Sequence, residues 1–187
     1  MKAALELANE LDLVARSHVQ LPDTKSIAIY SSCENYRYFL EREWSGGGRF
    51  LTMLMLNPST ATEYQNDPTL QRCETRARAG GFDGFRVLNI FALRSTDPKG
   101  LYDVEEPIGE HNDRFINVAL QDHGESSQFI CGWGNHGSLL NRSNEVRSLI
   151  EGQGVGYLAL GWTASGEPKH PLYLSYDTEP SLWKPQE

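Results

Sequence analysis

Short apolar runs recur along the second two thirds of the chain, and stretches with helical spacing separate them. The runs cover residues 53–56, 85–88, 129–131 and 156–160. They follow one another at roughly the 30 residues that a strand–helix–strand unit occupies. Alternation of this kind predicts a parallel sheet whose faces are covered by helices.

The first part of the chain shows other patterns. Apolar residues at a spacing of three to four predict a helix over residues 2–16. The aromatic-rich residues 36–42 alternate in part and predict a strand. After Gly46-Gly47-Gly48, the apolar residues 50–56 predict a buried strand, which we expect to pair with residues 36–42 as a hairpin.

Together these patterns predict an α/β fold of three layers, α/β/α, around a central and mostly parallel sheet. An antiparallel hairpin lies at one edge of this sheet, and the N-terminal helix packs outside it. The expected division is a helical extension over residues 1–25 and a single α/β domain over residues 26–187. A length of 187 residues suits one domain rather than two.

Composition narrows the class of protein. Hydrophobic residues make up 39% of the chain and charged residues 22%, which is typical of a globular protein. Charged or polar residues interrupt every apolar run before it reaches about 18 residues, so no membrane span is expected. Cys33, Cys73 and Cys131 form no CxxC pair, and the N-terminus lacks the apolar core of a signal peptide. These features predict a cytoplasmic protein.

The formal net charge of −8 argues against a strong non-specific polyanion binder, because phosphate affinity comes mostly from lysine and arginine. The charge is nevertheless uneven, and residues 67–99 are locally basic. Either these residues form a small basic face on an acidic body, or they belong to a solvated helix face. The basic residues of this segment are Arg72, Arg76, Arg78, Arg86, Arg94 and Lys99.

The segments that follow the apolar runs carry the candidate chemistry, because sheets of this kind bind ligands outside the carboxyl ends of their strands. Asn57 could hold a water or a base edge with its amide, or it could merely cap a turn together with Ser59. Asp67 before Pro68 is a good helix start, although Asp67 and Thr69 could also reach the site from a loop.

Two further segments leave alternatives open. Phe91 could stack on a base and Arg94 could bind a phosphate, or Phe91 is core and Arg94 pairs with Asp97. His170 lies between Lys169 and Pro171, where it would titrate near neutrality and stabilise a leaving anion, unless it is a structurally bonded histidine. No HxH or HxxxH pair occurs, so neither a metal nor another cofactor is expected.

Several of these segments resemble, in the same order, the family called domain of unknown function 1643. The resemblance extends over roughly residues 36–183 and implies no activity. The segments that carry it are Leu56-Asn57-Pro58-Ser59-Thr60, Asp67-Pro68-Thr69, residues 89–98, Trp133-Gly134 and Lys169-His170-Pro171-Leu172-Tyr173.

A more distant resemblance is to the uracil-DNA glycosylase superfamily, in which a catalytic loop, a base-binding strand end, a glycine and a His-Pro loop follow one another. Asn57-Pro58 resembles the first of these, Asn89 the second, Gly132-Trp133-Gly134 the third and His170-Pro171 the last. The sequence departs from that pattern at Ser59, where the superfamily often has glycine after Asn-Pro.

This resemblance implies a metal-independent hydrolase of the N-glycosidic bond to a nucleobase, modified bases included, in DNA or in a nucleotide. Asn57 would position the water and His170 would stabilise the departing base. The expected partners are a nucleobase, a nucleotide, or single-stranded or modified DNA. The expected substrate-binding residues are Ser59, Thr60, Asp67, Thr69, Asn89, Phe91, Arg94, Trp133, Gly134 and Tyr173.

Two other classes of protein compete with the enzyme. The first is a non-catalytic nucleotide or nucleic-acid binding module of the same fold, which would keep the pocket without using Asn57 as a catalyst. The second is an interaction protein whose Trp133, Trp162 and Trp183 form a partner surface.

Overall fold

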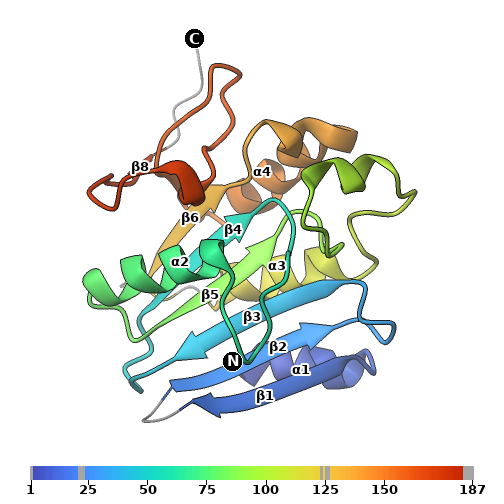
Figure 1. The fold of residues 1–187 in the computed structure, drawn as a ribbon, viewed down its shortest axis with the longest axis vertical. Helices are drawn as coiled ribbons and strands as arrows, with labels where there is room; N and C mark the ends of the chain where they lie inside the picture. The colour runs from blue at the N-terminus through green and yellow to red at the C-terminus, as the bar shows by residue number, and fades with distance from the viewer. Residues whose placement is uncertain (1, 21–23, 123, 125–126, 183–187) are drawn as a thin grey trace.

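The computed structural model describes residues 2–20, 24–122, 124 and 127–182 of the chain (Figure 1). The described strands are β1 (Val14–Gln20), β2 (Thr24–Tyr30), β3 (Arg37–Glu43), β4 (Phe50–Met55), β5 (Gly84–Asn89), β6 (Gln128–Gly132), β7 (Leu158–Ala159) and β8 (Ser181–Leu182). The described helices are α1 (Lys2–Glu10), α2 (Pro68–Ala79), α3 (Asn112–Gln121) and α4 (Arg142–Gly152), with the 3-10 helices η1 (Pro98–Tyr102), η2 (Asn135–Asn141) and η3 (Pro171–Tyr173). None of the described helices is long and apolar enough to cross a membrane.

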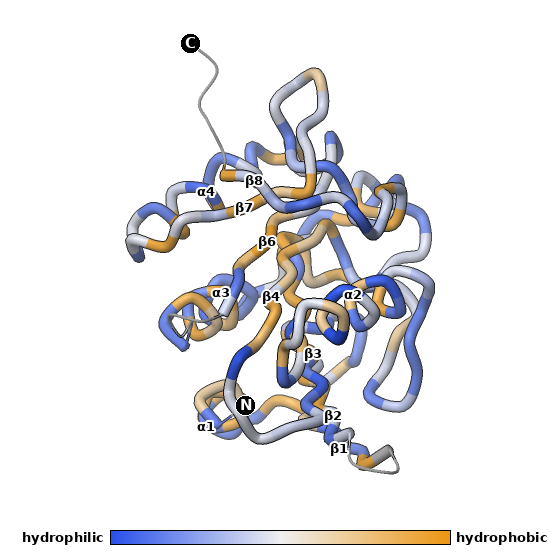
Figure 2. The backbone as a smooth tube through the Cα atoms, turned by 90° about the vertical axis from the view of Figure 1, so that its left-hand side faces the viewer, coloured by the Kyte–Doolittle hydropathy of each residue, from blue (hydrophilic) through white to orange (hydrophobic). Residues whose placement is uncertain are grey.

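Helices cover both faces of one sheet, as Figure 2 shows. α1, α3 and α4 contribute to the apolar core on one face, and α2 contributes to the core on the other. Successive side chains of β4 contribute to the two cores in alternation. Met53 and Met55 face α2, while Leu54 faces the helices on the opposite side of the sheet. This arrangement confirms the predicted α/β class.

The sheet is mixed, so the prediction of a mostly parallel sheet is wrong. The strand order is β1-β2-β3-β5-β4-β6-β7-β8. The pairs β5–β4, β4–β6 and β6–β7 are parallel, and the other neighbouring pairs of the described strands are antiparallel. The parallel strands are the ones that the recurring apolar runs indicate. The antiparallel arm β1-β2-β3 comes from the first part of the chain, where helix and strand patterns compete.

The helix predicted over residues 2–16 ends at Glu10, and the chain that follows is a strand. Asp12 adopts a left-handed conformation with φ of 54°, which stops the helix. β1 then pairs with β2 from Val14↔Tyr30 to Gln20↔Thr24. This long-range pairing overrides the helical spacing of the apolar residues, and it makes the segment part of the sheet.

The predicted hairpin between residues 36–42 and 50–56 does not form. β3 pairs with β2 and β5, and β5 separates β3 from β4. Every residue of β4 is buried. A strand that is apolar throughout suits the middle of a sheet, between the parallel neighbours β5 and β6, rather than an edge hairpin.

A buried ion pair joins the antiparallel arm to the parallel strands. Glu41 on β3 lies directly opposite Arg86 on β5. Arg86 Nε donates to Glu41 Oε2 at 2.5 Å, and Arg86 Nη2 lies 2.7 Å from Asp122 Oδ2. The Glu41 side chain is fully buried. Removing Arg86 leaves the buried Glu41 carboxylate without this cation, whereas removing Glu41 leaves Arg86 paired with Asp122.

We therefore expect Arg86→Met to lower the free energy of unfolding by about 3–5 kcal/mol. Urea titration of the variant and the unmodified protein measures this difference. Arg114→Met is the matched control, because it removes the guanidinium of the exposed pair with Glu10 and should cost no more than about 1 kcal/mol. Equal losses in the two variants would contradict the prediction.

Candidate functional site

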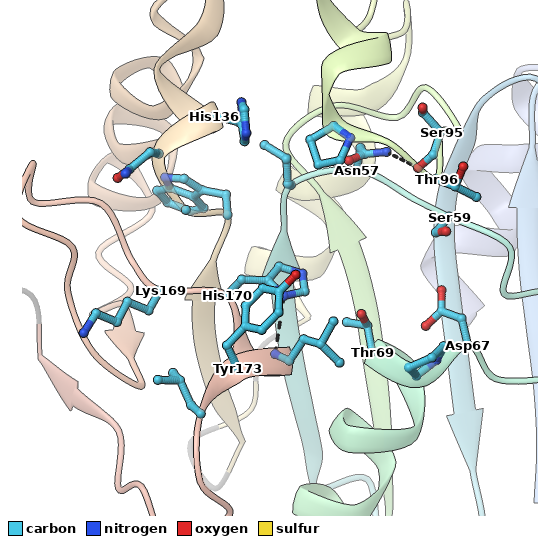
Figure 3. Close-up of a pocket in the computed structure, with 18 of the residues that line it drawn as sticks. Asn57, Ser59, Asp67, Thr69, Ser95, Thr96, His136, Lys169, His170 and Tyr173 are labelled. Atoms are coloured by element: carbon cyan, nitrogen blue, oxygen red, sulfur yellow. Dashed lines mark hydrogen bonds between the residues drawn. The ribbon is translucent and has the colours of Figure 1, made fainter.

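A cavity of about 640 Å³ opens where β4 and β6 end (Figure 3). Its walls come from the loop after β4, the start of α2, the loop after β5, the start of η2 and the C-terminal loop around η3. Ligand pockets of soluble proteins have about 300–1,000 Å³, so the cavity can hold a small organic molecule.

Most of the residues that the sequence suggests for the site line this cavity. They come from segments far apart in the chain, and Figure 3 shows how several of them converge. The residues that the structure brings together are Asn57, Ser59, Thr60, Asp67, Thr69, Trp133, Gly134, His170 and Tyr173. Asn89, Phe91 and Arg94 do not line the cavity.

Asn89 and Phe91 are enclosed in the interior. Phe91 is fully buried within the apolar core, so neither face of its ring is open to a base. Asn89 is 2% exposed, and its Oδ1 accepts a hydrogen bond from Arg37 Nη2. Asn112 Nδ2 on α3 donates to the carbonyls of Asn89 and Ile90 at 2.8 and 3.1 Å, which closes this strand end.

Arg94 and the other arginines of residues 67–99 are engaged within the protein. Arg94 Nη1 donates to the carbonyl of Glu34, and its guanidinium lies 5.4 Å from the ring centre of Tyr30. Arg72 and Arg76 donate to carbonyls of the C-terminal segment between residues 171 and 178. Arg78 pairs with Glu74, and Arg86 belongs to the buried ion pair. The locally basic sequence therefore does not present a free set of arginines around the cavity.

The amide of Asn57 ties two loops together. Its Nδ2 donates to the carbonyls of Pro58 and Ser95 at 3.0 and 2.8 Å. Its Oδ1 has no hydrogen-bond partner among the described residues. The nitrogen of Asn57 therefore closes the turn, as one of the two interpretations of the sequence expects, and its oxygen is free to accept a further hydrogen bond.

Asp67 likewise has a structural and a cavity-facing part. It is the N-cap of α2, and its Oδ1 accepts a hydrogen bond of 2.9 Å from the backbone N–H of Leu70. Pro68 follows at the first position of the helix. The residue is 9% exposed and lines the cavity. A carboxylate that caps a helix is held in position, so the negative charge of Asp67 has a fixed place in the site.

His170 is held as a neutral hydrogen-bond donor. Its Nδ1 accepts from the backbone N–H of Leu172 at 3.3 Å, which assigns the ring proton to Nε2. Burial lowers the pKa of His170 to about 4, and the Asp67 charge offsets only part of this effect. The expectation that His170 titrates near neutrality is therefore wrong, because the surrounding segments shield most of the half-buried ring from water.

Trp133 forms a wall of the cavity but is only 1% exposed, so it offers no open face for stacking. Its Nε1 donates to Glu167 Oε2 at 2.6 Å. Glu167 also accepts from Ser143 Oγ at 3.0 Å and pairs with Arg147, both on α4. Glu167 thereby anchors the loop that carries His170. The sequence gives no signal for this role beyond the position of Glu167 near His170.

Residues that sequence reasoning does not single out complete the site. Ser95 and Thr96 line the cavity from the loop after β5, and His136 lines it from η2. His136 Nδ1 lies 3.1 Å from the hydroxyl of Tyr102. In the sequence, His136 belongs to no HxH or HxxxH pair and to no other local motif that indicates a role. The position of His136 after a strand is the signal that could identify it.

Two buried arginines of β3 hold the loop between β4 and α2. Arg42 donates to the carbonyls of Thr62 and Glu63 at 2.8 and 2.9 Å, and to Asn66 Oδ1 at 2.9 Å. Arg37 donates to the carbonyl of Ala61 at 3.0 Å, and burial lowers its pKa to about 10. The position of this loop depends on these bonds, and the loop presents Asn57 and Asp67 at its two ends.

The described residues give no support to a metal site. They contain no group of three or more histidine, cysteine or acidic side chains placed to hold a metal ion. Trp183, which belongs to the suggested interaction surface, lies outside the described residues.

The fold and the site define a class of protein: an α/β protein with a ligand-sized cavity at the carboxyl ends of its parallel strands. The chain belongs to a family described as "protein of unknown function (DUF1643)", whose model matches residues 37–172. Neither the curated proteins nor the solved structures contain a significant match to the chain.

The pKa of His170 predicts a pH dependence of stability. The unfolded chain binds a proton at His170 near pH 6.5, whereas the folded protein binds it only near pH 4. Stability therefore rises with pH across this interval and falls as pH is lowered from 7 to 4, by at most about 3 kcal/mol from this residue. Urea titrations at pH 7 and pH 4.5 should show a smaller loss for His170→Gln than for the unmodified protein. Equal losses would contradict the assignment of a buried, neutral His170.

The role of Arg42 predicts a local effect. Arg42→Met keeps an apolar stem but leaves the carbonyls of Thr62 and Glu63 without their donor, so these amides and those around them should open more often. Hydrogen exchange of residues 61–67 should accelerate by at least about tenfold, since one lost charged hydrogen bond is worth about 1.5–3 kcal/mol. Arg78→Met on α2 is the matched control and should leave these residues unchanged. Unaltered exchange in Arg42→Met would show that the loop is held by other contacts.

Proposed function

We propose that the cavity binds a nucleobase-bearing molecule and hydrolyses the N-glycosidic bond between its base and its sugar. One observation carries the proposal: a neutral histidine with a fixed Nε2 proton shares the cavity with a carboxylate and an amide oxygen. These are His170, Asp67 and Asn57. A neutral donor, a fixed negative charge and a water acceptor are the three elements that this reaction needs.

His170 would stabilise the leaving base. When the C–N bond breaks, its electron pair goes to the base, which departs as an anion. A donor that is already in position lowers the free energy of this anion without reorganisation. Because the pKa of His170 is about 4, the ring is neutral at pH 7 and stabilises the anion by hydrogen bonding rather than by its charge.

Asn57 and Asp67 would act on the sugar side. Asn57 Oδ1 would accept a hydrogen bond from the attacking water and orient its oxygen toward the anomeric carbon. The negative charge of Asp67 would stabilise the positive charge that develops on the sugar, and its carboxylate would receive the water proton. That proton passes through solvent to the departed base, so the products are the free base and the free sugar hydroxyl.

The resemblance to the uracil-DNA glycosylase superfamily supports the same reaction class. Asn57-Pro58 and His170-Pro171, which resemble the first and last loops of that superfamily, both line or flank this cavity. Asn89, which resembles the base-binding residue, is buried and does not line the cavity. Recognition of the base would therefore rely on other groups, such as the hydroxyls of Ser59 and Thr69.

Release of a free base tests the proposal. The purified protein is incubated with DNA carrying diverse base modifications, with nucleosides and with nucleotides, and free bases are detected by mass spectrometry. We expect at least one substrate to lose its base. His170→Ala should slow this release about 10²- to 10³-fold, the usual effect of removing one donor to a developing anion.

Two controls make the outcome specific. Asn9→Ala changes an exposed asparagine on α1, remote from the cavity, and should keep the full rate. Asn57→Ala should abolish release, and circular dichroism establishes whether the variant is folded. A protein that binds members of the panel but releases no base is the binding module of the same fold, and the enzyme proposal is then wrong.

A further inference from the structure

The cavity carries almost no free positive charge. Lys169 is the one lysine or arginine among the described residues that line it. His170 is neutral at pH 7, because burial lowers its pKa to about 4. A buried or half-buried phosphate needs several positively charged or N–H donors to replace its water. Among the described lining residues, Lys169 is the one lysine or arginine that could do so, and the other polar side chains are a carboxylate, amides, imidazoles, an indole and hydroxyls.

The arginines nearest to the cavity serve the protein instead. On α2, Arg72 donates to the carbonyls of Pro171 and Leu174, and Arg76 donates to those of Ser175 and Tyr176. The guanidiniums of Arg72 and Arg76 also lie 4.3 and 5.4 Å from the ring centre of Tyr176. These contacts hold the C-terminal segment that forms one wall. If Arg72 or Arg76 gave up these contacts to bind a phosphate, the C-terminal segment would lose part of what holds it against α2.

The cavity also contains a fixed negative charge. The Oδ1 of Asp67 accepts a hydrogen bond from the N–H of Leu70, which keeps the carboxylate at the start of α2 beside Thr69 (Figure 3). Asp67 is the one acidic side chain among the described residues of the lining. Its charge balances that of Lys169, and it repels a phosphate that enters the cavity.

Hydroxyl groups dominate the remaining polar lining. Ser59, Thr60, Thr69, Thr96 and Tyr173 line the cavity, and their hydroxyls have no hydrogen-bond partner among the described residues. A hydroxyl can both donate and accept, so it suits neutral ligand groups such as sugar hydroxyls and the amide-like edges of a base.

Apolar side chains provide the complementary surface for a flat ring. Leu56, Pro68, Pro98, Leu172 and Leu174 all line the cavity. A pocket with apolar walls and a few uncommitted polar groups is typical of a small-molecule site. Together with the balanced charges, this lining matches a molecule with a planar apolar part, several hydroxyls and no net charge.

We infer that the substrate class is the free nucleoside, without a phosphate, rather than a nucleotide or a nucleic acid. This inference rests on the proposed function, whose site it specifies further. Asp67 is then a specificity-determining residue as well as a part of the proposed chemistry, because the same charge that favours a positive sugar disfavours a phosphate.

Affinity measurements on matched ligands test the inference. Calorimetric titration of the full chain compares a panel of ribo- and deoxyribonucleosides with their 5′-monophosphates and with a mixed-sequence single-stranded oligonucleotide. We expect the best nucleoside to bind at least about tenfold more tightly than its monophosphate. Its dissociation constant should also vary little with salt, because an uncharged ligand releases no counterions.

Variants link this selectivity to the cavity. Asp67→Asn keeps a good helix cap and removes the charge, so the preference for the nucleoside should shrink several-fold. Asp103→Asn changes an exposed acid outside the cavity and should leave the preference unchanged. Lys169→Ala, at an exposed side chain, should enlarge the preference and keeps the test decisive even if Asp67→Asn fails to fold.

The outcomes separate the two proposals. Monophosphates or oligonucleotides that bind as tightly as nucleosides would overturn this inference, while the glycosidic hydrolase would stand. A preference for nucleosides that Asp67→Asn or Lys169→Ala leaves unchanged would also overturn it, because the selectivity would then come from elsewhere. Failure of every member of the panel to bind would remove the proposed function and the inference with it.

Discussion

The guanidiniums of Arg37 and Arg42 lie inside the protein and donate to three backbone carbonyls of the loop between β4 and α2. A charge in this environment is costly unless its donors are engaged. Moving the loop would remove these three acceptors and leave each charge with fewer partners, so the two arginines of β3 hold the loop in place. The ends of this loop supply Asn57 and Asp67 to the cavity. Because Arg37 and Arg42 lie on β3, the antiparallel arm helps to position these two residues.

The sequence predicts the parallel part of the fold because its signals are local. Apolar runs at regular intervals identify β4, β5, β6 and β7, and helical spacing between them identifies α2, α3 and α4. The edge of the sheet is different. The helical spacing of apolar residues extends over residues 2–16, and only pairing with β2 makes the chain from Val14 to Gln20 a strand. That pairing joins segments through tertiary contacts, which the pattern of one segment does not contain.

The same distinction separates the site residues. The rule that ligands bind at the carboxyl ends of parallel strands is enough to bring Asn57 and Trp133 into one hypothesis, whereas His170 enters it from a loop further along the chain. The rule fails for Asn89 at the end of β5, because Asn112 from α3 donates to its carbonyl and closes that strand end. The low pKa of His170 has a similar origin, since the segments that bury it come from distant parts of the chain.

The number of charged residues along a sequence says little about the electrostatic potential at a site when the arginines donate hydrogen bonds to backbone carbonyls within the protein. On α2, Arg72 and Arg76 hold the C-terminal segment through its carbonyls, and that segment contributes Leu172 and Tyr173 to the cavity. The arginines of the helix thus hold one wall of the cavity in place. The charged group at this helix that lines the cavity is the carboxylate of its N-cap, Asp67. The arginines of this basic stretch of sequence do not line the cavity, and the charges of Lys169 and Asp67 balance each other there. Under the proposed function, selectivity depends on hydroxyls, apolar walls and the fixed negative charge of Asp67.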